Sequence, residues 1–328
     1  MWKFILISVL AALAFSSSGF PQDDFEKFYS LVQKKPQIHL SILNGQVQVF
    51  NIYKQEVISV YNSKGKGREE RIAQFIKDVY FPCEDFWNGF FDEQGFKEWT
   101  GKNWENLISS ATPGFLIPFQ VDFDSVFTAT AGKLKQLTGR VPEGKWYLIY
   151  GNKAANMGGL ANIGMFADFF GIGGEGYEQL LFALPHEINH QIMGKIQADD
   201  GTLLCRIINE GFSCFVNYLY WDKKISPAKN IGFTDKEWQW CINNENKIYD
   251  YTKGRLDSTD DNMKNKFARA HRFIFDGAPD RIAYFIGFRI CQAYINNNGA
   301  ESWKDIYNLS PGEVFRLSGY EKFMKNNL

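Results

Sequence analysis

Two helical segments near the middle of the chain constrain its fold most strongly. Residues 186–190 read HEINH, and on an α-helix positions i and i+4 project from the same face. His186 and His190 therefore lie side by side, as two nitrogen ligands of one zinc ion would. The glutamate beside them, Glu187, can act as a base on a metal-bound water. The chain has only 4 histidines, so we expect this pair to form a zinc site.

A catalytic zinc ion takes three protein ligands and keeps one position open for water. Glu210 is the best candidate for the third ligand, because it lies in a predicted helix over 203–212 that has apolar residues at helical spacing. A carboxylate buried in such a run needs a partner. Cys205 and Cys214 flank Glu210 and are alternative ligands, since zinc also binds thiolates. Packing in the core as small apolar residues is the favoured interpretation of both cysteines.

The first twenty residues predict export. One positive charge, Lys3, precedes an apolar run over 4–15, and four small residues follow at 16–19, which is the pattern of a secretory signal. The run is shorter than the ~20 residues that span a bilayer. The first cysteine is Cys83, so a lipid anchor at the cleavage zone is not expected. We expect a signal peptide over 1–19 and a periplasmic or extracellular protein without a membrane span.

The overall composition excludes several classes of protein. The chain has 328 residues, of which 45% are apolar, and a formal net charge of −1. This apolar content can bury a sizeable core, and the lack of a basic excess argues against binding to nucleic acid. The 5 cysteines are too few, and odd in number, for a disulfide-stapled scaffold. The oligomeric state does not follow from the composition.

Apolar periodicity predicts a fold that is mostly helical. Helical spacing runs over 68–80 and again over 122–138, where it stops at Gly139. In the C-terminal half, capping boxes predict helix starts at Thr234 and at Ser310. These segments lie on both sides of a short glycine-rich and β-branched stretch, so we expect an α+β fold.

That stretch contains the predicted strands. Residues 145–150 read KWYLIY, and a second strand is expected over 163–170. Residues 38–61 fit strands and a helix equally well. We expect a helical N-terminal region of unknown role over 20–140 and a second domain over 141–328.

The two metal-binding segments resemble those of the gluzincin metallopeptidases, most visibly the aminopeptidase N-type branch. That branch carries HExxHQxxG and then, after an 18-residue gap, WLNEGFA around its third ligand. Here residues 186–194 read HEINHQIMG and residues 207–213 read IINEGFS, with 19 residues between His190 and Glu210. The resemblance implies a thermolysin-like catalytic domain with a small sheet and an active-site helix.

Two further segments are similar to motifs of that family. Residues 284–287 read YFIG, and Gly299 follows at the family spacing, which implies that Tyr284 stabilises the oxyanion of the intermediate. His271 is a second candidate for that role. Residues 158–164 read GGLANIG and look like the family's substrate-binding strand. Ala161 stands there in place of the glutamate that binds a free amino group, which favours cleavage within a peptide.

The remainder of the chain departs from the aminopeptidases, because it has no room for their N-terminal β-domain. The pattern is closer to small, uncharacterised bacterial families of predicted zinc-dependent proteases. We therefore expect an exported zinc peptidase that acts on peptide or protein substrates, more as an endopeptidase than as an aminopeptidase. In this mechanism the zinc ion lowers the pKa of its water and Glu187 takes the proton.

Two alternatives stay open on the residues alone. The first is a non-catalytic binding protein of the cell envelope that retains the zinc site. The second is a zinc hydrolase of non-peptide amides or esters, because the motif specifies the activated water and not the acyl group that it attacks.

Overall fold

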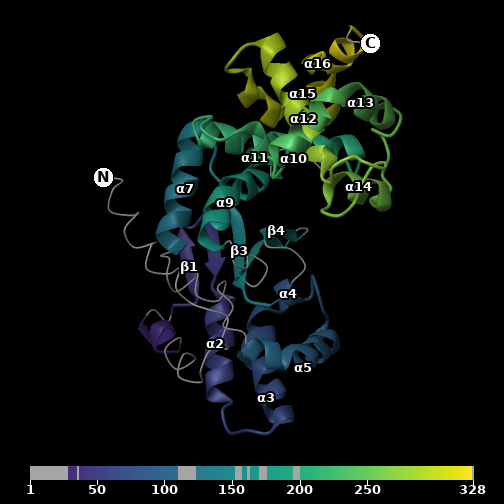
Figure 1. Cartoon of the computed structure of the whole chain (residues 1–328). Helices are drawn as coiled ribbons and strands as arrows, with labels where there is room; N and C mark the ends of the chain where they lie inside the picture. The colour runs from purple at the N-terminus through teal and green to yellow at the C-terminus, as the bar shows by residue number, and fades with distance from the viewer. Residues whose placement is uncertain are drawn as a thin grey trace.

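A small mixed sheet lies between two groups of helices (Figure 1). The computed structural model describes residues 29–34, 37–109, 123–151, 157–160, 163–169, 176–194 and 200–326. The predicted signal peptide and Ala161 lie outside these ranges. The expected α+β, mostly helical fold class is confirmed.

The sheet has five strands in the order β1-β2-β3-β5-β4. The strands are β1 (His39–Ile42), β2 (Val47–Phe50), β3 (Gly144–Ile149), β4 (Met157–Leu160) and β5 (Gly164–Asp168). The two outer pairs, β1–β2 and β4–β5, are antiparallel, whereas β2–β3 and β3–β5 are parallel. The predicted strands at 145–150 and 163–170 are thus confirmed, with bounds that differ by one or two residues.

The undecided segment at 38–61 contains both kinds of element. Its first half forms the β1–β2 hairpin, and its second half forms the helix α2 (Ile52–Asn62). Asn44 and Gly45 turn the hairpin with φ angles of 58° and 89°, a backbone conformation that asparagine and glycine tolerate best. This Asn-Gly pair is a local turn signal that separates β1 from β2.

Strand β3 is the centre of the sheet, and its residues from Trp146 to Ile149 are all buried. A strand between two parallel neighbours is covered on both faces, which explains the continuous apolar run. Its neighbour β2 comes from the region before residue 140, so one sheet joins residues from both sides of that position.

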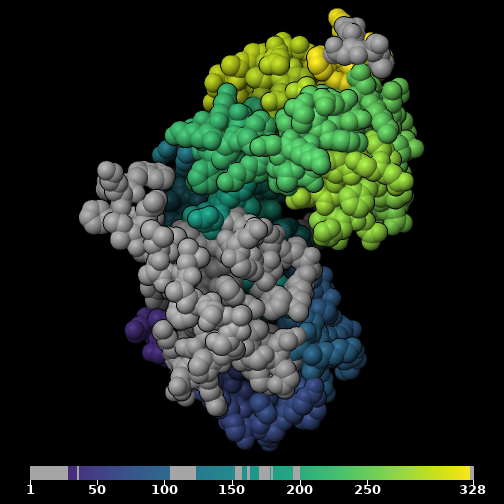
Figure 2. Space-filling view, in the orientation of Figure 1, coloured from purple at the N-terminus to yellow at the C-terminus, as the bar shows by residue number. Residues whose placement is uncertain are grey.

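Most of the N-terminal helices cover the end of the molecule opposite the C-terminal helices, whereas the last of them lies beside the C-terminal group (Figure 1 and Figure 2). They are α2, α3 (Arg68–Phe75), η1 (Ile76–Tyr80), η2 (Phe81–Cys83), α4 (Glu84–Trp87), α5 (Glu93–Ser109) and α7 (Phe123–Thr138). The predicted helix over 68–80 is confirmed, although its last five residues form a π-helical turn. The helix predicted over 122–138 is α7, and Gly139 ends it with a φ of 73°.

The C-terminal part is a set of helices that follow one another closely along the chain. They are α9 (Gly176–Met193), α10 (Leu203–Tyr220), α11 (Pro227–Asn230), α12 (Asp235–Asn243), α13 (Glu245–Lys253), α14 (Asp261–Ala268), α15 (Ile282–Asn298), η4 (Ser302–Asn308), α16 (Pro311–Ser318) and α17 (Tyr320–Asn326). The capping boxes expected at Thr234 and Ser310 are both present. None of the helices in the described ranges has the length and apolarity needed to cross a bilayer.

Helices α10 and α15 cross at two glycines that bring their backbones into direct contact. A Cβ atom built on Gly211 would lie 2.0 Å from the carbonyl carbon of Gly287, and one on Gly287 would lie 2.0 Å from the carbonyl oxygen of Ile207. No larger residue fits this crossing without separating the helices. Because α9 in turn packs on α10, the crossing places residues of α9, α10 and α15 around one point.

Candidate metal centre

The three predicted metal ligands meet between α9 and α10. His186 and His190 lie one turn apart on α9, and their Nε2 atoms are 2.8 Å apart. Glu210 reaches them from α10. Its Oε2 atom is 3.4 Å from Nε2 of His186 and 3.3 Å from Nε2 of His190. The helical spacing thus predicted the histidine pair, and the packing of two helices supplies the carboxylate.

The trio has the donor set and the size for a zinc-like cation. Zinc bonds to nitrogen and oxygen are ~2.0–2.1 Å long, so neighbouring ligands of a tetrahedral site lie about 3.3 Å apart. Both distances from Glu210 to the imidazoles are close to this value, and the distance of 2.8 Å between the two imidazole nitrogens is shorter. Glu210 is 4% exposed, and its Oε2 atom makes no hydrogen bond. A buried carboxylate oxygen without a hydrogen bond is costly unless a cation lies beside it, so these residues fit the ion.

The outer nitrogen of His190 is tied to α10. Its Nδ1 atom is 2.5 Å from Oδ1 of Asn209 and 3.1 Å from Oγ of Ser213. An amide oxygen only accepts hydrogen bonds, so this contact keeps a proton on Nδ1 and turns the lone pair of Nε2 toward the cluster. Metal-binding histidines are commonly oriented in this way.

The cysteines considered as alternative ligands lie outside the cluster. The Sγ atom of Cys214 is 3.6 Å from Nδ1 of His186, which is the nitrogen that faces away from Glu210. Cys214 therefore packs behind the imidazole, and Cys205 is a buried residue in the first turn of α10. Burial raises the pKa of the Cys214 thiol well above its usual value, so it stays protonated.

The charges of the trio depend on one another. Burial by itself would raise the pKa of Glu210, but the facing imidazoles and Arg206 outweigh it and hold that pKa well below its usual range. Burial would lower the pKa of His190, but the charge of Glu210 outweighs it and raises that pKa. Arg206 occupies the second carboxylate oxygen, with its Nη2 atom 3.1 Å from Oε1. Glu210 is therefore an ionised carboxylate, with Oε1 held by Arg206 and Oε2 facing the two imidazoles.

Tyr284 lies beside the cluster, as the sequence motif implied. Its ring is stacked on that of His186, with ring centres 5.9 Å apart and an angle of 8° between the planes. Burial and the charge of Glu210 raise the pKa of Tyr284 well above its usual value, so its hydroxyl keeps its proton. Glu187 is half-buried on α9, and its charge also raises this pKa. His271 is exposed, and its backbone N–H donates to Asp280.

A buried chain of hydrogen bonds supports the cluster from behind, and sequence reasoning missed it. Tyr307 of η4 donates its hydroxyl proton to Oδ1 of Asn189. The amide of Asn189 in turn donates to Oγ of Ser213 over 3.1 Å, and Ser213 contacts His190. Two polar residues, Asn189 and Ser213, stand at fully buried positions of apolar helices. Their presence in an apolar run was the signal that could have revealed this network.

A comparison with known proteins finds a matching family model whose description is not that of a peptidase. Residues 179–322 match the model of a family described as "Gliding motility protein GldB". The matched segment begins within α9 and ends within α17, so it contains the whole histidine–glutamate cluster. No curated protein and no solved structure matches the chain.

This match contradicts the prediction of a zinc peptidase, together with its description as a hydrolase, protease, metalloprotease and gluzincin. The reason lies in what the motif specifies. The HExxH spacing places two imidazoles on one helix face and so determines what the helix can hold, not whether a bound water attacks a substrate. Gly211 and Gly287, which the resemblance attached to catalytic motifs, are required by the helix crossing. The match is consistent with the expected export, and it favours the non-catalytic alternative.

Proposed function

We propose that the chain is a non-catalytic protein of the cell envelope, with a role in gliding motility, whose α9–α10 pair holds one zinc ion. The match of residues 179–322 to the gliding-motility family carries this proposal, because the segment includes α10 and the part of α9 that carries both histidines. The signal expected at 1–19 would deliver the protein to the envelope. A protein of the motility apparatus, rather than a peptide substrate, is then the partner.

The zinc ion would serve as a cross-link between two helices. His186 and His190 would bind it from α9 and Glu210 from α10, and two of these three residues are at least nine-tenths buried. Ligands from separate helices make the binding free energy of the ion part of the folding free energy. The similarity of these helices to those of gluzincins would then reflect a metal scaffold that is kept for stability and partner binding.

Complementation of a gliding strain that lacks the gene tests this proposal. A catalytic role needs the base beside the metal, whereas a structural role needs only the ligands. We therefore expect Glu187→Gln to restore the spreading of colonies to about the wild-type extent, and Glu210→Gln to restore little. Both proteins are purified in parallel, and zinc is measured in each. We expect about one zinc per chain in the wild type and in Glu187→Gln, and a clear loss in Glu210→Gln.

Two results would contradict the proposal. If Glu187→Gln is as defective as the deletion while its zinc content and abundance match the wild type, the base is needed and the role is catalytic. If both variants restore spreading fully although Glu210→Gln has lost its zinc, the metal has no part in the function.

A further inference from the structure

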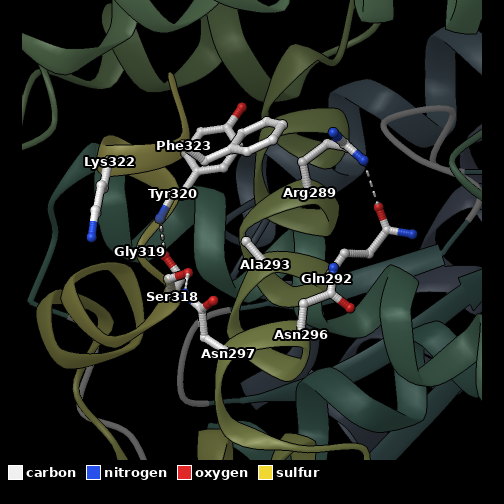
Figure 3. Close-up of a pocket in the computed structure, with 10 residues that line it drawn as sticks. All are labelled: Arg289, Gln292, Ala293, Asn296, Asn297, Ser318, Gly319, Tyr320, Lys322 and Phe323. Carbon is white, nitrogen blue, oxygen red and sulfur yellow. Dashed lines mark hydrogen bonds between the residues drawn. The ribbon is translucent and has the colours of Figure 1, made fainter. Parts of the chain in front are cut away.

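A pocket separate from the metal cluster lies between the second half of α15 and the turn that joins α16 to α17 (Figure 3). Its volume is about 360 Å³, which is within the range of ~300–1,000 Å³ typical of small-molecule sites. The metal ligands all come from α9 and α10, and none of them lines this pocket.

The back of the pocket is rigid and electrically neutral. The guanidinium of Arg289 makes two hydrogen bonds to the carboxylate of Glu245, at 2.8 and 3.1 Å. The hydroxyl of Tyr320 donates to the same carboxylate over 2.9 Å. Such a two-point contact fixes the geometry of both groups. The charge of Arg289 is therefore already balanced, and the exposed Lys322 is the other cationic residue among those that line the pocket.

The turn between α16 and α17 is shaped to fit the amide side chains of α15. Gly319 has a φ of 64°, and a Cβ atom on it would lie 2.4 Å from Nδ2 of Asn297. The glycine thus leaves space for Asn297 to donate a hydrogen bond to the carbonyl oxygen of Ser318. This bond closes one side of the pocket.

The open side combines amides with an exposed aromatic ring. Gln292 and Asn296 are one helical turn apart on α15, and Asn296 is exposed. The side-chain oxygen of Gln292 accepts a hydrogen bond from Arg289. The NH₂ group of Gln292 therefore points away from that guanidinium. Phe323 of α17 is 46% exposed, so part of its ring is accessible from solvent. Figure 3 shows the rings of Phe323 and Tyr320 on one side and the amides of Asn296 and Asn297 across from them.

We propose that this pocket binds an acetamido sugar, as part of a glycan chain of the cell envelope. A primary amide offers one acceptor oxygen and two donor hydrogens, which match the N–H and C=O of an acetamido group and the hydroxyls of the sugar ring. The face of Phe323 can pack against the C–H groups of the ring. The small side chain of Ala293 leaves space between these groups. This binding goes beyond the proposed role of the metal cluster and does not depend on it.

Titration calorimetry of the mature full chain with chitotriose tests the proposal. Maltotriose is the comparison probe, because it has the same number of sugar rings and no acetamido group. Phe323→Ala and Asn296→Ala change exposed side chains of the pocket, so both should fold. Phe273→Ala is the matched control, since Phe273 is 54% exposed and does not line the pocket.

We expect chitotriose to bind and maltotriose to bind much more weakly. Phe323→Ala and Asn296→Ala should each weaken chitotriose binding about tenfold, which corresponds to ~1.4 kcal/mol, and Phe273→Ala should leave it unchanged. Three results would overturn the proposal: no binding of chitotriose up to about 10 mM, a range that covers weak complexes, equal binding of the two probes, or chitotriose binding that neither pocket variant weakens.

Discussion

At the scale of single residues, two of the buried carboxylates, Glu56 and Glu210, are stabilised in opposite ways. Glu210 is ionised, because imidazoles and a guanidinium surround it. Glu56 of α2 is 4% exposed, and burial and the nearby Asp168 raise its pKa well above the usual value. Its Oε2 atom accepts a hydrogen bond from the backbone of Tyr150 over 3.1 Å, while Oε1 makes none. Glu56 therefore keeps its proton at a pH where an exposed glutamate has lost it.

This raised pKa predicts a pH-dependent stability. The folded chain binds a proton at Glu56 that the unfolded chain releases near its ordinary pKa, so stability falls as the pH rises above that value toward the raised one. Glu56→Gln has nearly the same shape and cannot ionise. We expect it to raise the melting temperature at pH 8 by roughly 2–4 °C, the effect of about 1 kcal/mol, and to have little effect near pH 4. Thermal unfolding at both pH values measures this, and an equal shift at both would contradict it.

At the scale of elements, the crossing of α10 and α15 at two glycines determines where the cluster forms. We expect Gly211→Ala to lower the free energy of unfolding by about 1–3 kcal/mol or more, because the added methyl group meets the backbone of α15. Gly132→Ala in α7 is the matched control. Nothing lies within 4 Å of its added Cβ, so it should stabilise the helix by roughly 0.5–1 kcal/mol.

Urea unfolding of both variants provides the measurement. Gly211→Ala should also bind zinc more weakly, since the crossing holds Tyr284 against His186. A Gly211→Ala variant as stable as the control would show that the two helices can separate without cost.

At the scale of the whole molecule, the metal cluster lies in the middle of a continuous series of packed elements. Helix α9 packs on β4 and α7, α10 packs on α9, and α15 packs on α10 and α16. A zinc ion between α9 and α10 should therefore stabilise the entire chain rather than one local segment. At a free concentration of 100 times its Kd, a ligand of the folded state adds about 2.7 kcal/mol.

We expect the melting temperature to rise with added zinc and to fall when a chelator removes it, in one cooperative transition. Glu210→Gln should respond to neither treatment, because it lacks the ionised ligand. Differential scanning fluorimetry across a zinc series measures both proteins. A wild-type melting temperature that is insensitive to zinc and to the chelator would exclude a stabilising metal site.

The histidine pair, the helix ends and the two strands at 145–150 and 163–170 followed from the sequence by itself. These features depend on residues within a few positions of one another, where the period of a helix or strand and the chemistry of a cap decide the outcome. The apolar spacing over 203–212 likewise predicted that Glu210 lies in a buried helix. The sequence could not determine activity, because the spacing specifies that two imidazoles can face one ion and not what happens at that ion.

Only the tertiary structure decided the contacts between distant parts of the chain. Strand β2 pairs with β3 although a long run of helices separates them, Gly211 meets Gly287 across two helices, and Glu56 lies near Asp168. Such pairings arise when whole elements bury their apolar faces against each other, and many alternative partners have similar local patterns. The sequence therefore determined the elements and the ligands they carry, while the packing of those elements decided which of them share one sheet, one crossing and one buried site.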